Sequence, residues 1–364
     1  MTPLHRRLID IIRREGPISV ERYMALCLGD PAHGYYMTRD PFGARGDFIT
    51  SPEVSQMFGD LLGVGAAYAW RAMGAPARFH FVELGPGRGT LSKDALRAMR
   101  AMPELIGAAE VHLVETSPML RDIQRETLAD ARAPVSWHGD IASLPDGPAI
   151  FVANEFFDAL PIRQFVRTAE GWRERLVGSN QDDELCFVLA EATSPANDAA
   201  PIDALREEAD LSRAIVTALA SRLAAKDGGA ALIIDYGHAA QGSSDTLQAM
   251  RAHAFDSPLA SPGEADLTVH VDFPALIRDA AAAGAATQGP VTQSAFLRAM
   301  GIATRARALG IRATDEQKRD LASGMARLVD ESAPTAMGLL FKVIALRAPM
   351  LPPLPGFDEV SPSP

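Results

Sequence analysis

The stretch "FVELGPGRGTL" (residues 81–91) constrains the fold of this 364-residue chain most strongly. It places Gly85, Gly87 and Gly89 directly after a short apolar run. Glycine tolerates positive φ angles and lets another molecule approach the backbone closely. A G-x-G-x-G turn between a buried strand and a helix is therefore typical of an α/β sheet that binds a nucleotide-like cofactor. Such turns also occur as plain structural corners, so the surrounding residues must decide.

Short apolar segments alternate with longer amphipathic segments from residue 79 onward. Strands that alternate with helices predict a parallel sheet covered on both faces, which is the doubly wound α/β class. The segment 161–191 departs from this alternation and predicts a small antiparallel excursion with a turn at Glu170-Gly171. We expect strands at 79–84, 110–115, 134–139, 149–154, 230–237 and 337–347, a hairpin partner near 287–293, and helices at 90–101, 117–130 and 203–226.

The chain is longer than one ordinary core organises, so we expect a large domain with additions. The Pro-rich end of the chain lacks the apolar residues that would fold it, and we expect it to be disordered. We expect the chain to have four parts: a helical and loop N-terminal region that caps the cleft (1–75), an α/β domain (76–347), its insertions (about 161–200 and 238–284) and the tail (348–364).

The charge balance and the cysteine content exclude several classes of protein. Lys+Arg 35 against Asp+Glu 46 gives a net charge of −11, which argues against a nucleic-acid partner or an anionic membrane surface. Two cysteines, Cys27 and Cys186, are too few for a disulfide framework or for a zinc cluster of cysteines. No apolar run approaches the roughly 20 residues that span a bilayer, so we expect no membrane insertion.

The opening stretch, "MTPLHRRLIDIIRREG", is Arg-rich and places apolar residues at helical spacing. Asp10 and Glu15 are atypical of a transit peptide, so the stretch predicts an amphipathic helix of the fold itself. Because no targeting peptide is evident, we expect a cytoplasmic protein of bacterial type.

The residues around the glycines indicate which kind of cofactor the turn would bind. The dinucleotide pattern G-x-G-x-x-G is not met, because Thr90 stands where its third glycine would be, and no phosphate-binding P-loop pattern is present. Glu83 lies two residues before Gly85. A carboxylate there favours a ligand that is cationic at this end and is unfavourable beside a pyrophosphate.

Further acids follow the next strands, at the edge of the sheet where such folds bind ligands. Glu115 is placed to accept from both hydroxyls of a ribose; the alternative interpretation is an acid at a helix start. Asp140 could accept from an exocyclic amino group while Ile141 packs on the purine, and "NEFFDALP" ends the fourth strand. An adenosine with a sulfonium, an ammonium and no phosphate fits this arrangement, which predicts S-adenosylmethionine (SAM) as cofactor.

On these residues the chain resembles the MidA-like family of class I SAM-dependent methyltransferases, whose mitochondrial members are complex I assembly-factor protein arginine methyltransferases. The resemblance implies a seven-stranded, Rossmann-like sheet with an additional, mainly helical N-terminal and insertion domain. It covers most of the chain and runs through "GYY", "PFGARGDFITSPEVSQMFG", "VELGPGRGTLSKDALR", "VETSPMLRDIQ", "NEFFDALPIRQF", "LIIDYG", "HAFDSPLASPGEADLTVHVDF" and "MGLLFKVIALR".

The resemblance also implies roles for individual residues. By the same likeness, the activity would be dimethylation of an arginine on a subunit of the respiratory NADH dehydrogenase, which makes that subunit the expected protein partner. The resemblance implies that Gly85, Gly87 and Gly89 line the methionine side of the cofactor and that Asn154 and Glu155 lie in the cleft beneath the methyl group. It implies that Glu115 holds the ribose and that Asp140 and Ile141 hold the adenine; Glu83 joins the expected cofactor contacts through its position before the turn.

Methyl transfer to an arginine needs carboxylates, because the guanidinium is cationic and strongly basic. "NEFFDAL" supplies Glu155 and Asp158, which lie three residues apart and can face the same side. We expect Glu155 to be the main guanidinium anchor and Asp158 to support it, or else to cap the turn. Asp235, at the end of the fifth strand, is a further catalytic candidate.

Two loop-rich stretches could contribute to the same cleft. "GDFITSPE" (46–53) could fold over the cofactor as a lid that brings Asp47, Thr50 and Ser51 to it, or could be a turn followed by a helix with Ser51 as the N-cap. The second stretch is the insertion at about 238–284. It has no close metal-ligand spacing such as H-x-x-x-H, so we predict no metal. Its cleft candidates are His253, His270 and Asp272.

Three classes of function fit these residues. The first is a protein arginine N-methyltransferase, and the second is a methyltransferase on another protein side chain or on a small molecule. The third is a SAM-binding assembly chaperone with little turnover. The glycine spacing and Glu83 disfavour a dehydrogenase.

Overall fold

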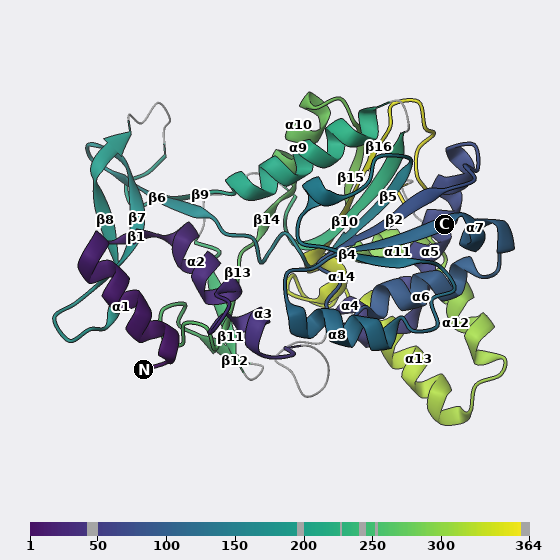
Figure 1. Cartoon of the computed structure of the whole chain (residues 1–364), viewed down its shortest axis with the longest axis horizontal. Coiled ribbons are helices and arrows are strands. Elements are labelled where there is room, and N and C mark those ends of the chain that lie inside the picture. The colour runs from purple at the N-terminus through teal and green to yellow at the C-terminus, as the bar shows by residue number, and fades with distance from the viewer. Residues whose placement is uncertain (42–49, 195–199, 226–227, 240–244, 252–253, 358–364) are drawn as a thin grey trace.

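The computed structural model describes residues 1–41, 50–194, 200–225, 228–239, 245–251 and 254–357. The chain forms two units that lie side by side (Figure 1). One is a twisted sheet between layers of helices, and the other combines helices with two small sheets (Figure 1).

Within the described residues, seven strands form the central sheet in the order β15-β16-β10-β5-β2-β3-β4, and the short β14 pairs beside the end of β10. The middle strands run parallel, whereas β16 and β15 run antiparallel to their neighbours. This arrangement confirms the doubly wound α/β class. The strands are β2 (Phe79–Leu84), β3 (Ala109–Val114), β4 (Val135–His138), β5 (Ala149–Asn154), β10 (Gly229–His238), β14 (Val271–Asp272), β15 (Ala286–Thr292) and β16 (Phe341–Arg347).

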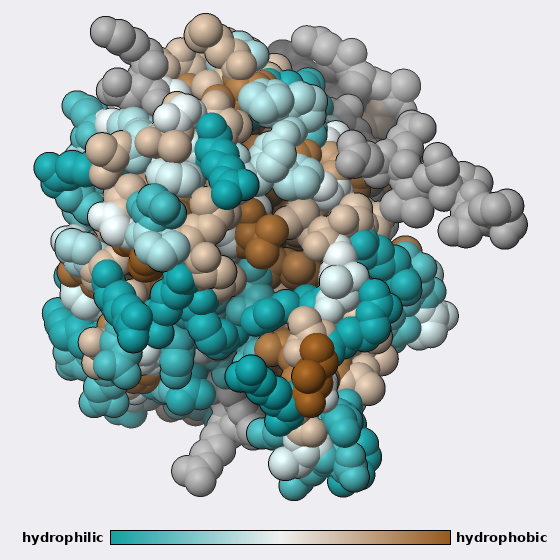
Figure 2. Space-filling model, turned by 90° about the vertical axis from the view of Figure 1, so that its right-hand side faces the viewer, coloured by the Kyte–Doolittle hydropathy of each residue, from teal (hydrophilic) through white to brown (hydrophobic). Residues whose placement is uncertain are grey.

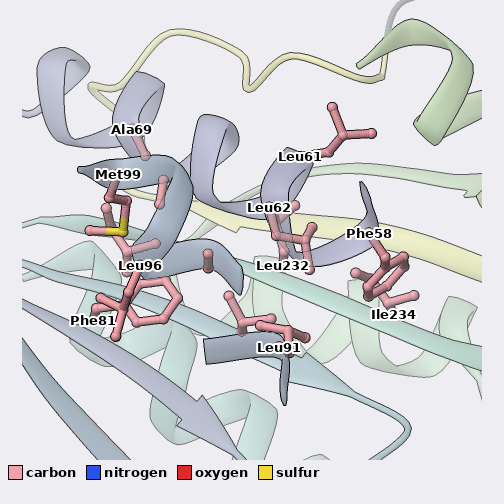
Figure 3. Close-up of a cluster of buried hydrophobic side chains, with 14 of the residues drawn as sticks. Phe58, Leu61, Leu62, Ala69, Phe81, Leu91, Leu96, Met99, Leu232 and Ile234 are labelled. Atoms are coloured by element: carbon pink, nitrogen blue, oxygen red, sulfur yellow. The ribbon is translucent and has the colours of Figure 1, made fainter. Parts of the chain in front are cut away.

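All six residues of β2 and of β5 are buried, as expected for parallel strands that helices cover on both faces. The helices α5 (Gln56–Ala72) and α6 (Thr90–Met99) pack on one face, and α9 (Asp210–Ala224) and α10 (Phe273–Ala282) pack on the other. Figure 3 shows side chains of α5 and α6 meeting Leu232 and Ile234 of β10. Burying one side chain of this size contributes about 1.5–3 kcal/mol.

Helix boundaries follow local capping residues. The Ser117 hydroxyl accepts from the Leu120 N–H at the start of α8, and Thr314 and Gln317 form a reciprocal capping box at the start of α13. The remaining helices beside the central sheet are α7 (Pro103–Ala108), α8 (Pro118–Thr127), the 3-10 turn η1 (Ile141–Ser143), α11 (Gln293–Ala299), α12 (Ile302–Gly310), α13 (Asp315–Leu328) and α14 (Met337–Leu340).

The second unit joins the N-terminal helices to the two insertions. Leu8, Tyr23, Val177 and Leu267 come from distant parts of the sequence and share one buried cluster. The additional domain is thereby confirmed, and sheets as well as helices build it. Its elements are α1 (Pro3–Glu15), α2 (Val20–Gly29), α3 (Tyr35–Thr38), β1 (Ile18–Ser19), β6 (Arg163–Thr168), β7 (Gly171–Ser179), β8 (Leu185–Ser194), β9 (Leu205–Glu208), β11 (Gln248–Arg251), β12 (Ala254–Asp256) and β13 (Asp266–Thr268).

Two predicted boundaries need correction. Residues 56–72 form α5, which packs on the central sheet, so position 75 does not mark the junction between the units. The expected tail is ordered over residues 348–357, because Leu354 packs into the core and its N–H donates to Gln288 Oε1 at 2.8 Å.

Two predicted helices also begin differently. The helix α4 (Ser51–Val54) has Thr50 rather than Ser51 at its N-cap. Ser55 follows in an extended conformation, and its hydroxyl accepts from the Met57 N–H at the start of the separate α5. The predicted helix 203–226 starts only at Asp210, because residues 205–208 pair with β6 as the edge strand β9.

Figure 2 shows the face formed by the right-hand side of Figure 1, where small apolar spots lie between hydrophilic side chains. Ile311, after α12, and Met350 are among the large apolar residues that are exposed. None of the helices in the described part of the chain has the length and apolar character needed to cross a membrane.

Candidate active site

The glycine turn links β2 to α6 at the carboxyl edge of the sheet. Gly85, Gly87 and Gly89 have φ angles of +62°, +52° and +80°. A Cβ at Gly85 would lie 2.8 Å from the Phe156 ring, and no side chain caps the start of α6. The turn therefore needs glycine. The Ser92 N–H of the first helical turn is bound by the Glu83 carboxylate, and no N-cap side chain competes with a ligand for the N–H groups before it.

Glu83 is buried directly before this turn, and the Ser92 hydroxyl donates to its carboxylate. Burial raises the pKa of Glu83 to about 8, because desolvation disfavours the charged form. A cationic group of a ligand would offset that cost. A cavity beside the glycine turn is lined by Glu83, Gly85, Gly87, Asn154 and Glu155.

Glu115 follows β3 and is held by Gln124 of α8. Its carboxylate accepts from the Ser117 N–H at 2.8 Å and from Gln124 Nε2 at 3.1 Å, and burial raises its pKa. Gln124 Nε2 also donates to the Gly87 carbonyl O at 2.6 Å, and Gln124 Oε1 accepts from the Trp137 indole at 2.9 Å. Gln124 thus ties the glycine turn to the expected ribose acid. Sequence reasoning missed it, because one glutamine in an amphipathic helix carries no distinctive pattern.

Asp140 and Ile141 lie after β4, in line with Glu115. The Glu115 N–H donates to the His138 carbonyl O at 3.0 Å, which places the two strand ends together. Asp140 is exposed and its Oδ1 accepts from the Ser143 N–H at 2.8 Å, while Ile141 is partly buried. The structure therefore brings the expected adenine residues to the same edge as the ribose acid.

Asn154 and Glu155 end β5. Glu155 has a φ of +52°, a conformation that side chains other than glycine rarely adopt and that costs about 1–3 kcal/mol. Its Oε1 accepts from Asn154 Nδ2 at 2.9 Å and from the Ser51 N–H at 2.9 Å. Burial raises the pKa of Glu155 to about 7. Strained backbone and a raised pKa at one acid are typical of a functional position.

Two oxygens beside Glu155 are buried without a hydrogen-bond partner: Asn154 Oδ1 and Asp158 Oδ1. Both side chains are more than nine-tenths buried, and burial raises the pKa of Asp158 to about 6. Buried acceptors are nearly always satisfied in folded proteins. Asn154 lines the cavity beside the glycine turn, so its oxygen is suited to a ligand that carries N–H donors.

Asp235 is fully buried within β10, three residues before the strand ends, and backbone groups occupy its carboxylate. Its Oδ2 accepts from the N–H groups of Phe156, Phe157 and Asp158 at 3.2, 2.9 and 3.2 Å. Burial and the neighbouring acids raise the pKa of Asp235, whereas these backbone donors act in the opposite direction. Asp235 holds the turn that carries the other two acids, which gives it a positioning role, and its catalytic role stays a prediction.

Replacing Asp235 with asparagine is expected to lower the free energy of unfolding by about 2–4 kcal/mol. The asparagine NH2 group would replace one of the two carboxylate oxygens, and in either orientation it would face a buried N–H donor. Urea titration measures the loss. Asp272→Asn is the matched control, since Asp272 is exposed and caps α10 through the Ala275 N–H, a task that asparagine performs as well. Equal stability of the two variants would contradict the positioning role.

Residues 50–53, at the start of α4, lie beside the glycine turn. Thr50 and Pro52 line the same cavity as Gly85, and the Thr90 hydroxyl donates to the Glu53 carboxylate. Ser51 contacts Glu155 through its backbone rather than through the predicted side chain. Asp47 lies outside the described residues.

His270 and Asp272 lie away from this site. His270 Nδ1 lies 3.2 Å from His238 Nε2, and both rings line a separate cavity of about 630 Å³ between the two units. Asp272 lines that cavity too and is the N-cap of α10. His253 lies outside the described residues.

Comparison with known proteins identifies the family. A family model described as "Putative S-adenosyl-L-methionine-dependent methyltransferase" matches residues 61–291. The mouse and human mitochondrial proteins named protein arginine methyltransferase NDUFAF7 are 40% and 38% identical over 95% of this chain, and the match covers 84% and 83% of their lengths.

A solved structure extends the comparison to a bacterial protein. A COG1565 superfamily member from Burkholderia thailandensis, bound to S-adenosyl-homocysteine, superimposes with a TM-score of 0.84 at 31% identity, covering 98% of this chain and 95% of that one. The cofactor of the present chain is accordingly SAM. The chain belongs to the family of SAM-dependent methyltransferases that includes the NDUFAF7 proteins and the COG1565 superfamily.

Proposed function

We propose that this protein is a protein arginine N-methyltransferase that modifies a subunit of respiratory complex I during assembly. Two kinds of observation support the proposal. The mammalian relatives carry the name protein arginine methyltransferase. The end of β5 combines partly desolvated acids with buried oxygens that lack a partner, next to the glycine turn.

The unpartnered oxygens of Asn154 and Asp158, beside Glu155, carry the proposal furthest. A guanidinium offers five N–H donors and a fixed positive charge. Bound there, it would satisfy the oxygens and favour the ionised form of Glu155, whose pKa is raised to about 7. A neutral acceptor would not compensate for the desolvation of these acids in their ionised form.

Transfer itself is an in-line displacement that the protein promotes mainly by alignment and exclusion of water. SAM supplies a methyl carbon on a sulfonium. The S–C bond breaks as a guanidinium nitrogen forms the new N–C bond, and the nitrogen then loses a proton. The Glu155 carboxylate would orient that nitrogen and take the proton, while Asp158 holds a second N–H and Asp235 keeps the turn in place.

The experiment uses the purified chain, isotopically labelled SAM and an extract from a strain that lacks the chain and contains unmodified complex I. The expected result is labelled methylarginine on one complex I subunit, identified by mass spectrometry. Label on another side chain or on a small molecule would overturn the choice of acceptor. Binding of SAM without any transferred label would instead favour the assembly-chaperone function.

A further inference from the structure

A cluster of three potential metal ligands lies away from the cofactor edge, in the amino-terminal half of the sheet. His80 of β2 pairs directly with Glu110 of β3, and His112 is two residues further along β3. Successive side chains of a strand point to opposite faces, so Glu110 and His112 share a face. That face also carries Val82 and the layer formed by α9 and α10.

The distances between the ligand atoms are those of a metal site. His80 Nδ1 lies 3.0 Å from His112 Nε2 and 3.5 Å from Glu110 Oε2, and all three atoms lie within 4.8 Å of one another. Ligand atoms that share a tetrahedral zinc ion lie about 3.4 Å apart. A small rotation of Glu110, whose side chain is 23% exposed, would complete the set.

We propose that His80, Glu110 and His112 bind a divalent transition-metal ion, with Zn²⁺ as the best fit to two imidazoles and one carboxylate. The proposal is independent of the acceptor assigned above. An E-x-H pair on one strand and a histidine on its neighbour present three ligands from a rigid base, and solvent supplies the fourth position.

Hydrogen bonds around the cluster fit an occupied site. An ion would take the lone pairs of His80 Nδ1 and His112 Nε2, which leaves protons on the other two ring nitrogens. Both N–H groups have an acceptor in place: the Asp146 carbonyl O lies 3.1 Å from His80 Nε2, and His138 Nε2 lies 3.0 Å from His112 Nδ1. Such partners orient metal-bound histidines.

The chain of donors continues toward the cofactor edge. His138 Nδ1 would donate to Ser143 Oγ at 3.3 Å, and the Ser143 hydroxyl donates to the Asp140 carbonyl O at 2.8 Å. Each donor therefore meets one acceptor when the ion is bound. The ion would also fix the turn that holds the expected adenine residue Asp140.

Without an ion the same hydrogen bonds run in the opposite direction. His80 Nδ1 accepts from His112 Nε2, His112 Nδ1 accepts from His138 Nε2, and the Ser143 hydroxyl rotates to donate to His138 Nδ1. The hydrogen bonds accommodate both states, so the positions of the three ligand atoms carry the proposal.

Arg78 provides the outer support that metal-bound carboxylates usually have. Its guanidinium donates to Glu110 Oε1, which leaves Oε2 on the side of the histidines. The sequence predicts no metal because the ligands are about thirty residues apart and no close spacing is present. Only the register between β2 and β3 brings them together.

The test is titration of the metal-free, full-length protein with CoCl2, followed by visible absorption and by competition with ZnCl2. We expect one equivalent to bind, with the spectrum of a four-coordinate ion. Loss of an outer partner already costs 10–100-fold in affinity, so His80→Ala and Glu110→Gln are each expected to weaken binding about 100-fold or more.

His238→Ala is the matched control, because His238 and His270 form a close histidine pair without a third ligand in the described part of the chain. Its cobalt affinity should equal that of the unaltered protein. Affinity for S-adenosyl-homocysteine confirms that each variant is folded, and Glu110→Gln decides if His80→Ala does not fold. The proposal is overturned if the unaltered protein takes up no cobalt, or if Glu110→Gln binds it as tightly.

Discussion

Valine in place of Gly87 is expected to abolish binding of S-adenosyl-homocysteine, with a loss of affinity of at least about 100-fold, or about 2.7 kcal/mol. Gly87 has a φ of +52°, which a β-branched residue adopts only at a cost of roughly 1–2 kcal/mol or more. The new side chain would also fill the space at the start of α6 and displace the carbonyl that accepts from Gln124. Isothermal titration calorimetry measures the affinity.

Gly74→Val is the control for backbone strain alone. Gly74 also has a positive φ, of +88°, but a Cβ there would have no neighbouring atom within 4 Å, and the residue lies after α5, away from the cofactor edge. This variant should lose some stability and keep its affinity. If Gly87→Val binds S-adenosyl-homocysteine with unchanged affinity, the glycine turn is not part of the cofactor site.

Glutamine in place of Glu155 is expected to leave cofactor affinity within a few-fold and to reduce the rate of methyl transfer by about 100- to 10,000-fold. Glutamine fills the same volume and still accepts from the Ser51 N–H, but it carries no charge for a cationic acceptor and cannot take its proton. Calorimetry with the demethylated cofactor and single-turnover transfer from labelled SAM separate the two effects.

The same acid should set the pH dependence of transfer. Burial raises the pKa of Glu155 to about 7, so its carboxylate becomes more ionised as the pH rises through that value. Transfer should therefore increase between about pH 6 and pH 8 in the unaltered protein, and this increase should be absent in Glu155→Gln. The exposed Glu126 supplies the control, since Glu126→Gln should keep both rate and pH profile. A similar rate in both variants would exclude Glu155 from the acceptor site.

The sequence alone predicts the central sheet because its middle strands are short apolar runs. The runs at β2 and β5 leave no alternative to a sheet covered on both faces. The positions of the site acids follow from the same reasoning, since the ends of parallel strands meet at one edge. Glu115 and Glu155 could therefore be located without coordinates.

What the sequence does not reveal depends on contacts between distant residues. Gln124 acts through hydrogen bonds to residues of other elements, and Asp235 is identified as a positioning residue only by the three N–H groups it accepts from. The break between α4 and α5 depends on the extended conformation of Ser55, which its position inside an apparently continuous helical pattern conceals. These features depend on tertiary contacts, so local secondary-structure propensity does not predict them.

The second unit is assembled from the N-terminal helices and from two loops of the sheet domain, whose residues share one buried cluster. No single stretch of polypeptide encodes it. A fragment that lacks only the N-terminal helices would expose the part of the cluster that the insertions supply. A chimera between relatives would have to exchange several segments at once. The second unit should therefore evolve by coordinated substitutions in these segments, because it cannot be gained or lost as one continuous insertion.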